Sequence, residues 1–301
     1  MTLELHLDGE EGRATRRQLL TLAGTSVVSL VLGSLITRRR RQSGYEAKKA
    51  QPVRKTAVYK HYYEIPVPKL GYQGIVKEPN LSNIVVAEWE SDIGKIQRAL
   101  RWRNITQAVE QRYGIPKDYL LGMICVESGG DPARPNDLGD GGVGLIHMQP
   151  LLTDKYGLRQ ITNSRRLRDF YQGRKIREAL QVTGRDLKEL ISYDDRFHPI
   201  KNIDAAGRML ADSYVKHRNW RRALIEYGGT RKYYREVMRF VNLVQNPKFI
   251  AKVIEDFNGR NMGVAVESQP LTFDRYVDIF HQSNRNYGLD WYRKLPRYPI
   301  K

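Results

Sequence analysis

The chain has 301 residues, of which 51 are lysine or arginine and 33 are aspartate or glutamate, giving a formal net charge of +18. This charge predicts attraction to polyanions, which include nucleic acid, anionic lipid and acidic cell-wall polymers. No zinc-finger spacing, ribonucleoprotein motif or basic zipper is present, so specific nucleic-acid binding is not favoured. The single cysteine, Cys125, excludes an internal disulfide, and the lack of metal-ligand spacings predicts no metal and no organic cofactor.

The first patterned segment runs from Leu19 to Ile36 without a charged residue, which is about the shortest length for a membrane span. It follows Arg16 and Arg17 in a context that resembles a twin-arginine export signal, and no small-x-small cleavage site is evident after it. Residues 1–41 are therefore predicted to be a signal or an uncleaved membrane anchor. The arginines from Arg38 to Arg41 leave the orientation of that anchor open.

Residues 42–90 mix proline, lysine and tyrosine without a sustained period, and they are predicted to form an extended linker or arm. From Asp92 the apolar residues fall on one helical face up to Gly114. The domain that begins at about residue 91 is thus predicted to be mainly α.

The next helix is predicted from Pro116 to Ser128, because Pro116 suits a first helical turn and two glycines follow Ser128. Glu127 lies three, four and seven residues from apolar side chains of this helix, so it is expected on the face that points to the core. A carboxylic acid that is partly buried keeps its proton to higher pH than an exposed one. Glu127 is therefore a candidate general acid, and a structural hydrogen bond or ion pair is the alternative.

A glycine-dense loop follows and ends in the sequence GGVGLIHMQP. Asp131, Asp137 and Asp140 lie between Glu127 and that sequence. Any of them would serve a hydrolase that needs a second carboxylate to hold a water, although turn residues of this kind are commonly solvated.

The rest of the domain is again predicted to be helical. Arg165 to Leu180 and Asp186 to Ile191 are expected to form extra helices in an insertion at about residues 159–197, which shapes a cleft or binds a partner. Tyr227 closes an apolar stripe with Trp220 and Leu224, which would turn its phenol inward. Residues 246–301 form a C-terminal extension rich in aromatic residues, which either packs on the domain or binds a wall by stacking.

Three blocks in order, GIPKDYLLGMICVESGGDP, GGVGLIHMQP and NIDAAGRMLADSYVKHRNWRRALIEYGG, resemble the signature blocks of the soluble lytic transglycosylases, a family similar to goose-type lysozyme. The resemblance covers roughly residues 92–245. It implies a lysozyme-like helical catalytic domain at residues 91–245.

The resemblance also implies roles for individual residues. Glu127 matches the catalytic acid and base of the family. His147 stands where the family has glutamine, Gly228 where asparagine follows the tyrosine, and Glu226 where a small residue precedes it. The positions that match residues at the substrate are Ser128, Gly144, Leu145, Ile146, His147 and Tyr227.

The family cuts the bond between N-acetylmuramic acid and N-acetylglucosamine with one glutamate and leaves a 1,6-anhydro end. The resemblance therefore implies an enzyme of the cell envelope, in the periplasm, whose partner is the peptidoglycan strand. The membrane, through the N-terminal segment, and a protein of the envelope machinery are expected as further partners. Two alternatives stay open: a hydrolytic muramidase on the same fold, and a wall-binding or assembly protein without activity. The departures at residues 226 and 228 make the second of these credible.

Overall fold

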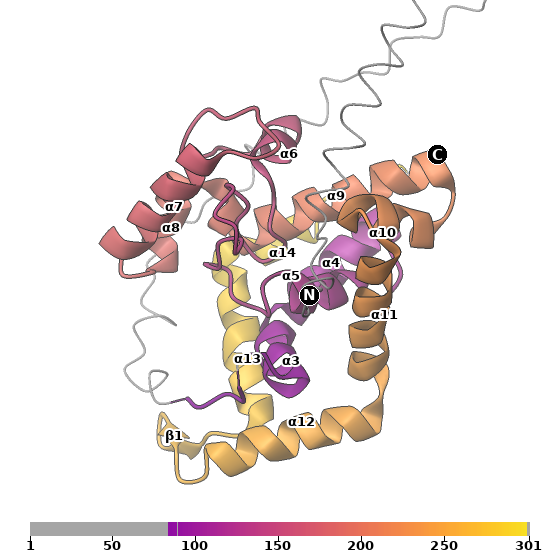
Figure 1. The fold of residues 1–301 in the computed structure, drawn as a ribbon. Coiled ribbons are helices and arrows are strands. Elements are labelled where there is room, and N and C mark those ends of the chain that lie inside the picture. The colour runs from indigo at the N-terminus through magenta and orange to yellow at the C-terminus, as the bar shows by residue number, and fades with distance from the viewer. Residues whose placement is uncertain (1–83, 89, 300–301) are drawn as a thin grey trace, which may run out of the picture.

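The computed structural model describes residues 84–88 and 90–299. This part of the chain is almost entirely helical (Figure 1), so the prediction of a mainly α domain is confirmed. Its one sheet pairs two short antiparallel strands, β1 (Ala265–Val266) and β2 (Gln269–Pro270). The helices are α3 (Asp92–Ala99), η1 (Leu100–Trp102), α4 (Arg103–Tyr113), α5 (Tyr119–Glu127), α6 (Pro150–Lys155), α7 (Phe170–Val182), α8 (Leu187–Tyr193), η2 (Asp195–Phe197), α9 (Pro199–His217), α10 (Trp220–Gly228), α11 (Arg231–Gln245), α12 (Pro247–Arg260), α13 (Phe273–Asn284), η3 (Arg285–Tyr287) and α14 (Leu289–Tyr292).

Helix α5 is the central element of the fold. It packs against α3, α4, α9 and α11, and every residue from Leu120 to Cys125 is buried. Gly122 allows the close approach of α11, since a Cβ atom there would lie 2.9 Å from the carbonyl oxygen of Val237. A helix that is apolar on all sides belongs in the interior of a domain. Its last residue, Glu127, therefore lies at the end of a helix that is buried in the core.

Helix α5 begins three residues later than predicted, at Tyr119. Asp118 adopts a left-handed conformation at φ 65° and its side chain does not cap the helix. Glu110 of α4 replaces that cap: its two carboxyl oxygens accept hydrogen bonds from the backbone N–H groups of Asp118 at 3.0 Å and Leu120 at 2.9 Å. The first N–H groups of a helix lack partners within the helix, so this contact from α4 fixes the start of α5.

The carboxyl of Glu110 predicts a pH dependence of stability. Burial raises its pKa from 4.5 to about 8, against the opposing effect of the two N–H donors. The native state therefore holds a proton that the unfolded chain releases, and the stability contributed by Glu110 is complete below about pH 4.5 and lost as the pH rises through about 8. Urea unfolding at pH values from 5 to 9 should show the free energy of unfolding falling faster in the parent than in Glu110→Gln. Parallel curves for the two proteins would contradict this assignment.

Helices α11, α12 and α13 form three sides of a frame around α3 and α5 (Figure 1). The C-terminal extension completes this frame by packing, because its aromatic side chains are buried in the core. Tyr292 donates a hydrogen bond to Asp204 of α9, and the backbone N–H of Tyr298 donates to the carbonyl of Arg112 at 2.8 Å. The buried aromatic side chains of the extension are Phe257, Phe273, Tyr276, Tyr287 and Tyr292.

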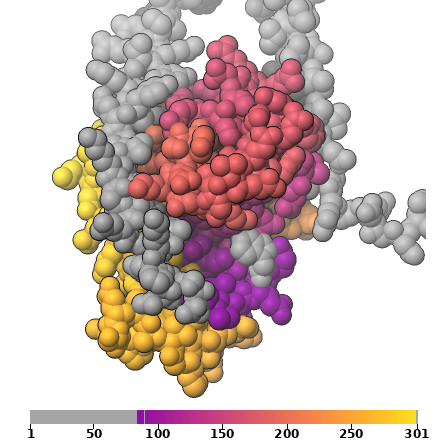
Figure 2. Space-filling view, turned by 90° about the vertical axis from the view of Figure 1, so that its left-hand side faces the viewer, coloured from indigo at the N-terminus to yellow at the C-terminus, as the bar shows by residue number. Residues whose placement is uncertain are grey.

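The insertion stands out from the domain and carries α7 and α8 (Figures 1 and 2). Its first helix begins at Phe170 and not at Arg165, because the carboxylate of Asp169 accepts a hydrogen bond from the backbone N–H of Gln172 at 3.1 Å and caps it there. Gly173 of α7 packs directly on the glycine-dense loop, since a Cβ atom there would lie 1.8 Å from the carbonyl oxygen of Gly139. The insertion therefore supports that loop from outside.

The predicted membrane anchor and most of the predicted linker lie outside the described residues. In residues 84–88 and 90–299, no helix combines the length and apolar character that a bilayer span requires. The described end of the linker packs on the domain, where Val85 exchanges two backbone hydrogen bonds of 2.9 Å with the carboxamide of Asn261.

Candidate active site

The carboxylate of Glu127 lies at the C-terminal end of α5, where the side chain is 10 % exposed. The chain turns away at once, because Gly129 and Gly130 both adopt positive φ angles, 59° and 89°. Ser128 is fully buried, and its hydroxyl accepts a hydrogen bond from the backbone N–H of Gly130 at 3.2 Å. Ser128 thus orders the turn after α5, and its predicted contact with substrate stays a prediction.

The side chain of His147 lies beside that carboxylate. Its Nδ1 lies 3.4 Å from Oε2 of Glu127, and its side chain is 8 % exposed. The other ring nitrogen, Nε2, is buried and has no hydrogen-bond partner among the described residues. The structure therefore brings together the two residues that the motifs placed at the active site, 20 positions apart in the chain.

The loop that carries His147 is pinned by a residue that sequence reasoning did not single out. The Oδ1 atom of Asn202, on α9, accepts from the backbone N–H of Ile146 at 2.8 Å, and its Nδ2 donates to the carbonyl of Val143 at 3.4 Å. Gly144 passes close to the same side chain, with φ 93° and a Cβ position that would lie 2.4 Å from Nδ2 of Asn202. Only glycine fits there without displacing α9.

A buried arginine holds the other end of the loop. Arg196 is fully buried, and all five of its N–H donors are used. Its Nε and Nη2 donate to the two carboxylate oxygens of Asp194 at 2.9 and 2.7 Å, and Nη2 also donates to Gln172 of α7 at 2.6 Å. Its Nη1 donates to the carbonyls of Gly141 at 2.5 Å and Met148 at 3.1 Å. Arg196 therefore ties the insertion to both ends of the segment that presents His147.

Tyr227 reaches the site from α10, as its apolar stripe predicted. The side chain is 1 % exposed, and its hydroxyl donates to the carbonyl of Ile146 at 3.4 Å, one residue before His147. The structure also explains the glycine that follows it, because a Cβ atom at Gly228 would lie 2.0 Å from the ring of Tyr233. The ring of Tyr233 thus occupies the space of the side chain that is missing at position 228.

The remaining predicted positions lie inside the fold or on its surface. The side chains of Leu145 and Ile146 are buried in the core, so contact with a substrate at these positions would involve their backbone. Glu226 lies on the outer side of α10, where Lys216 at 2.6 Å and His217 at 2.7 Å pair with it. It is therefore not an active-site residue in this arrangement.

The three loop aspartates have other partners. Asp140 is fully buried and accepts from Nε2 of Gln149 at 3.2 Å. Asp131 accepts from the backbone N–H of Ala133 at 2.9 Å and pairs with Arg185 at 2.5 Å. Asp137 is 79 % exposed and pairs with Arg134 at 3.3 Å. These contacts give each carboxylate a structural or solvent-facing place, so none of them supports a second catalytic carboxylate.

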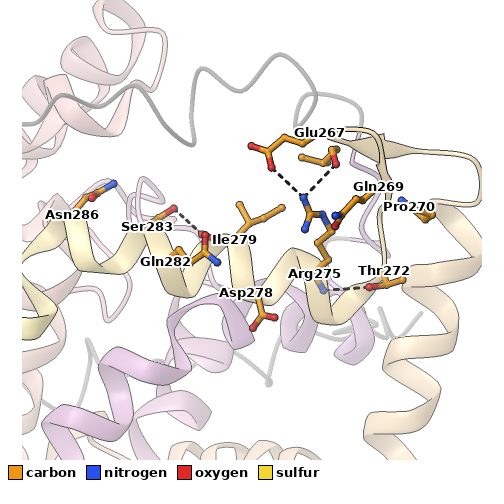
Figure 3. Close-up of a pocket in the computed structure, with 11 residues that line it drawn as sticks. Glu267, Gln269, Pro270, Thr272, Arg275, Asp278, Ile279, Gln282, Ser283 and Asn286 are labelled. Atoms are coloured by element: carbon orange, nitrogen blue, oxygen red, sulfur yellow. Dashed lines mark hydrogen bonds and ion pairs between the residues drawn. The ribbon is translucent and has the colours of Figure 1, made fainter.

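A cavity of about 820 Å³ lies elsewhere, between the β1–β2 hairpin and α13 (Figure 3). Polar side chains of the C-terminal extension line it, and Arg275 bridges it by pairing with Glu267 at 3.2 Å. Glu127 and His147 take no part in its walls. This cavity is therefore a different place from the one that the chemistry indicates.

Comparison with known proteins agrees with the chemistry. Residues 104–239 match the Transglycosylase SLT domain family, a range that contains α5, the glycine-dense loop, the insertion and Tyr227. No curated protein and no solved structure matches the chain. Domains of this family act on peptidoglycan in the cell envelope. Residues 104–239 of this chain are therefore a transglycosylase SLT domain, of the lytic transglycosylase family.

Proposed function

We propose that the chain is a lytic transglycosylase that cuts the β-1,4 bond between N-acetylmuramic acid and N-acetylglucosamine. The observation that carries this proposal is a single carboxylate, Glu127, held 10 % exposed at the end of the central helix and beside a buried histidine. A carboxyl in such a place can exchange a proton with a bound sugar while most water is excluded. The loop aspartates are engaged elsewhere, which favours a one-carboxylate reaction.

In the proposed reaction, Glu127 first protonates the glycosidic oxygen as the bond to the muramic C1 breaks. The acetamido group of the muramic residue stabilises the positive charge that develops at C1. Glu127, now a carboxylate, then takes the proton from the C6 hydroxyl, and the C6 oxygen bonds to C1. The proton returns to Glu127, no water is consumed, and the new end is a 1,6-anhydro sugar.

Mass spectrometry of the products from purified wall tests this reaction. Anhydro ends are lighter by one water than the reducing ends that a hydrolase leaves. Reducing ends as the sole product would replace the proposal by a muramidase on the same fold. If the parent protein shows no turnover, the remaining alternative is a wall-binding protein without activity. Anhydro ends that vanish in Glu127→Gln are the expected result.

His147 is predicted to orient the carboxyl of Glu127, in place of the glutamine that the family has there. A hydrogen bond to a charged group is worth about 1.5–3 kcal/mol, so His147→Ala should lower kcat/KM by roughly tenfold to 100-fold. His147→Gln should stay within a few-fold of the parent, because a carboxamide can donate at the same position. Initial rates on purified wall measure both variants. If His147→Ala cleaves at the parental rate, the imidazole does not position the acid.

A further inference from the structure

The outer side of α10 and α11 is rich in exposed cationic side chains. Six exposed cationic side chains occur within 18 positions at the end of α9 and on these two helices. Helices α10 and α11 pack together, and the guanidinium of Arg221 lies 5.3 Å from the ring centre of Tyr234 across their interface. We call this group the outer cationic cluster: Arg218, Arg221, Arg222, Arg231, Lys232 and Arg235.

The cluster has little compensation from carboxylates. Glu226 lies among these residues, but Lys216 and His217 already pair with it, and Glu236 follows Arg235 on α11. None of the five arginines of the cluster forms an ion pair with a carboxylate in the part of the chain that the structure describes. The positive charge therefore faces solvent.

The positions of these cations do not serve helix stability. Arg221 and Arg222 lie in the first turn of α10, and Arg231 and Lys232 in the first turn of α11. Neither first turn contains an acidic residue. Because the N-terminal end of a helix carries partial positive charge, each such cation is mildly unfavourable there. A cluster that weakens the two helices it stands on is better explained by a binding role than by folding.

The chemistry of the surface separates the classes of polyanion. No large hydrophobic side chain is exposed between positions 218 and 235, and the half-buried Trp220 is stacked on Tyr214 at 4.2 Å. The cluster thus lacks the apolar groups with which proteins enter the interface of a bilayer. Peptidoglycan itself is a polyanion, because its peptide stems carry free carboxylates. On α10, Tyr227 faces the glycine-dense loop whereas Arg221 and Arg222 face solvent.

We propose that the outer cationic cluster binds the stem carboxylates of peptidoglycan strands that neighbour the one being cut. This inference rests on the proposed function, since it takes peptidoglycan as the substrate. Exposed ion pairs are individually weak and are screened by salt. Several of them together would hold the domain on the wall while letting it move along the mesh.

Binding of the full-length chain to insoluble purified wall tests the cluster, with Glu127→Gln in every protein so that cleavage does not disturb the measurement. Arg221→Glu/Arg222→Glu should lower the affinity for wall about tenfold or more at low salt, and should flatten its salt dependence. The matched control is Lys248→Glu/Lys252→Glu on α12, which makes the same change in net charge at two exposed lysines and should bind as the parent does. If charge reversal unfolds the protein, the milder pair Arg231→Gln/Arg235→Gln is compared with Lys248→Gln/Lys252→Gln, which makes the same smaller change in net charge.

Two further probes identify the anion. Wall whose free carboxylates have been converted to neutral amides should bind all variants equally and weakly. Vesicles containing anionic phospholipid should not distinguish Arg221→Glu/Arg222→Glu from the lysine control. An equal loss on amidated wall, a loss on vesicles alone, or unchanged binding to intact wall would each overturn the proposal. Failure of the proposed function is a separate result, because it appears as absent turnover by the protein that retains Glu127.

Discussion

Replacing Glu127 by glutamine is expected to abolish cleavage of the glycan strand while the fold and wall binding persist. A carboxamide has nearly the shape of the carboxyl but can neither donate an acidic proton nor take one back. General acid–base groups contribute about 10²–10⁴-fold to rate, and one group serves both halves of the proposed reaction. The loss should therefore lie near the upper end of that range. Soluble anhydro products released from purified wall give the rate.

Glu178→Gln is the matched control for this experiment. Glu178 is an exposed glutamate on α7 that pairs with Lys175 across one helical turn, so its replacement should change neither rate nor stability measurably. Thermal unfolding of both variants separates lost chemistry from lost structure. Residual activity of Glu127→Gln within tenfold of the parent would show that another group supplies the proton.

The sequence predicted the family, but the reason it gave for the position of Glu127 was incomplete. The apolar spacing of Glu127 suggested a core-facing stripe, whereas α5 is buried on all sides and no face of it is distinguished. What fixes the carboxylate is the end of the helix, where Gly129 and Gly130 turn the chain. The prediction of the family rested on the order of the three motifs, and this order does not depend on the helical face that Glu127 occupies.

Contacts between distant segments account for what the sequence did not reveal. The start of α5 depends on Glu110 from the preceding helix, and periodicity within α5 contains no trace of that contact. Asn202 is the first residue of the third motif, but the residues around it predict only that it lies in a buried helix. Its contact with Ile146 cannot be seen in the sequence. The ring of Tyr233 lies in the space beside Gly228, and the sequence does not show this contact. A single sequence shows the residues but not these pairings.

The insertion is predicted to be part of the active-site support, and Arg196 is the residue that tests this. Replacing Arg196 by methionine leaves the carboxylate of Asp194 buried without its partner, and it frees the carbonyls of Gly141 and Met148. Breaking a buried ion pair from one side costs about 3–5 kcal/mol. Arg196→Met should therefore lower the free energy of unfolding by about that amount. Urea unfolding followed by circular dichroism measures it.

The same variant should lose activity in conditions where it is still folded, because Arg196 holds the segment from Gly141 to Met148 that presents His147 to Glu127. Arg293→Ala is the control: this exposed arginine pairs with Asp290 at 3.8 Å within one helical turn, and exposed pairs are worth about 0–1 kcal/mol. If Arg196→Met is folded and cleaves wall at the parental rate, then the guanidinium does not hold the loop. A variant that is stable but slow would show that Arg196 positions the loop for the reaction and is not needed for the stability of the fold.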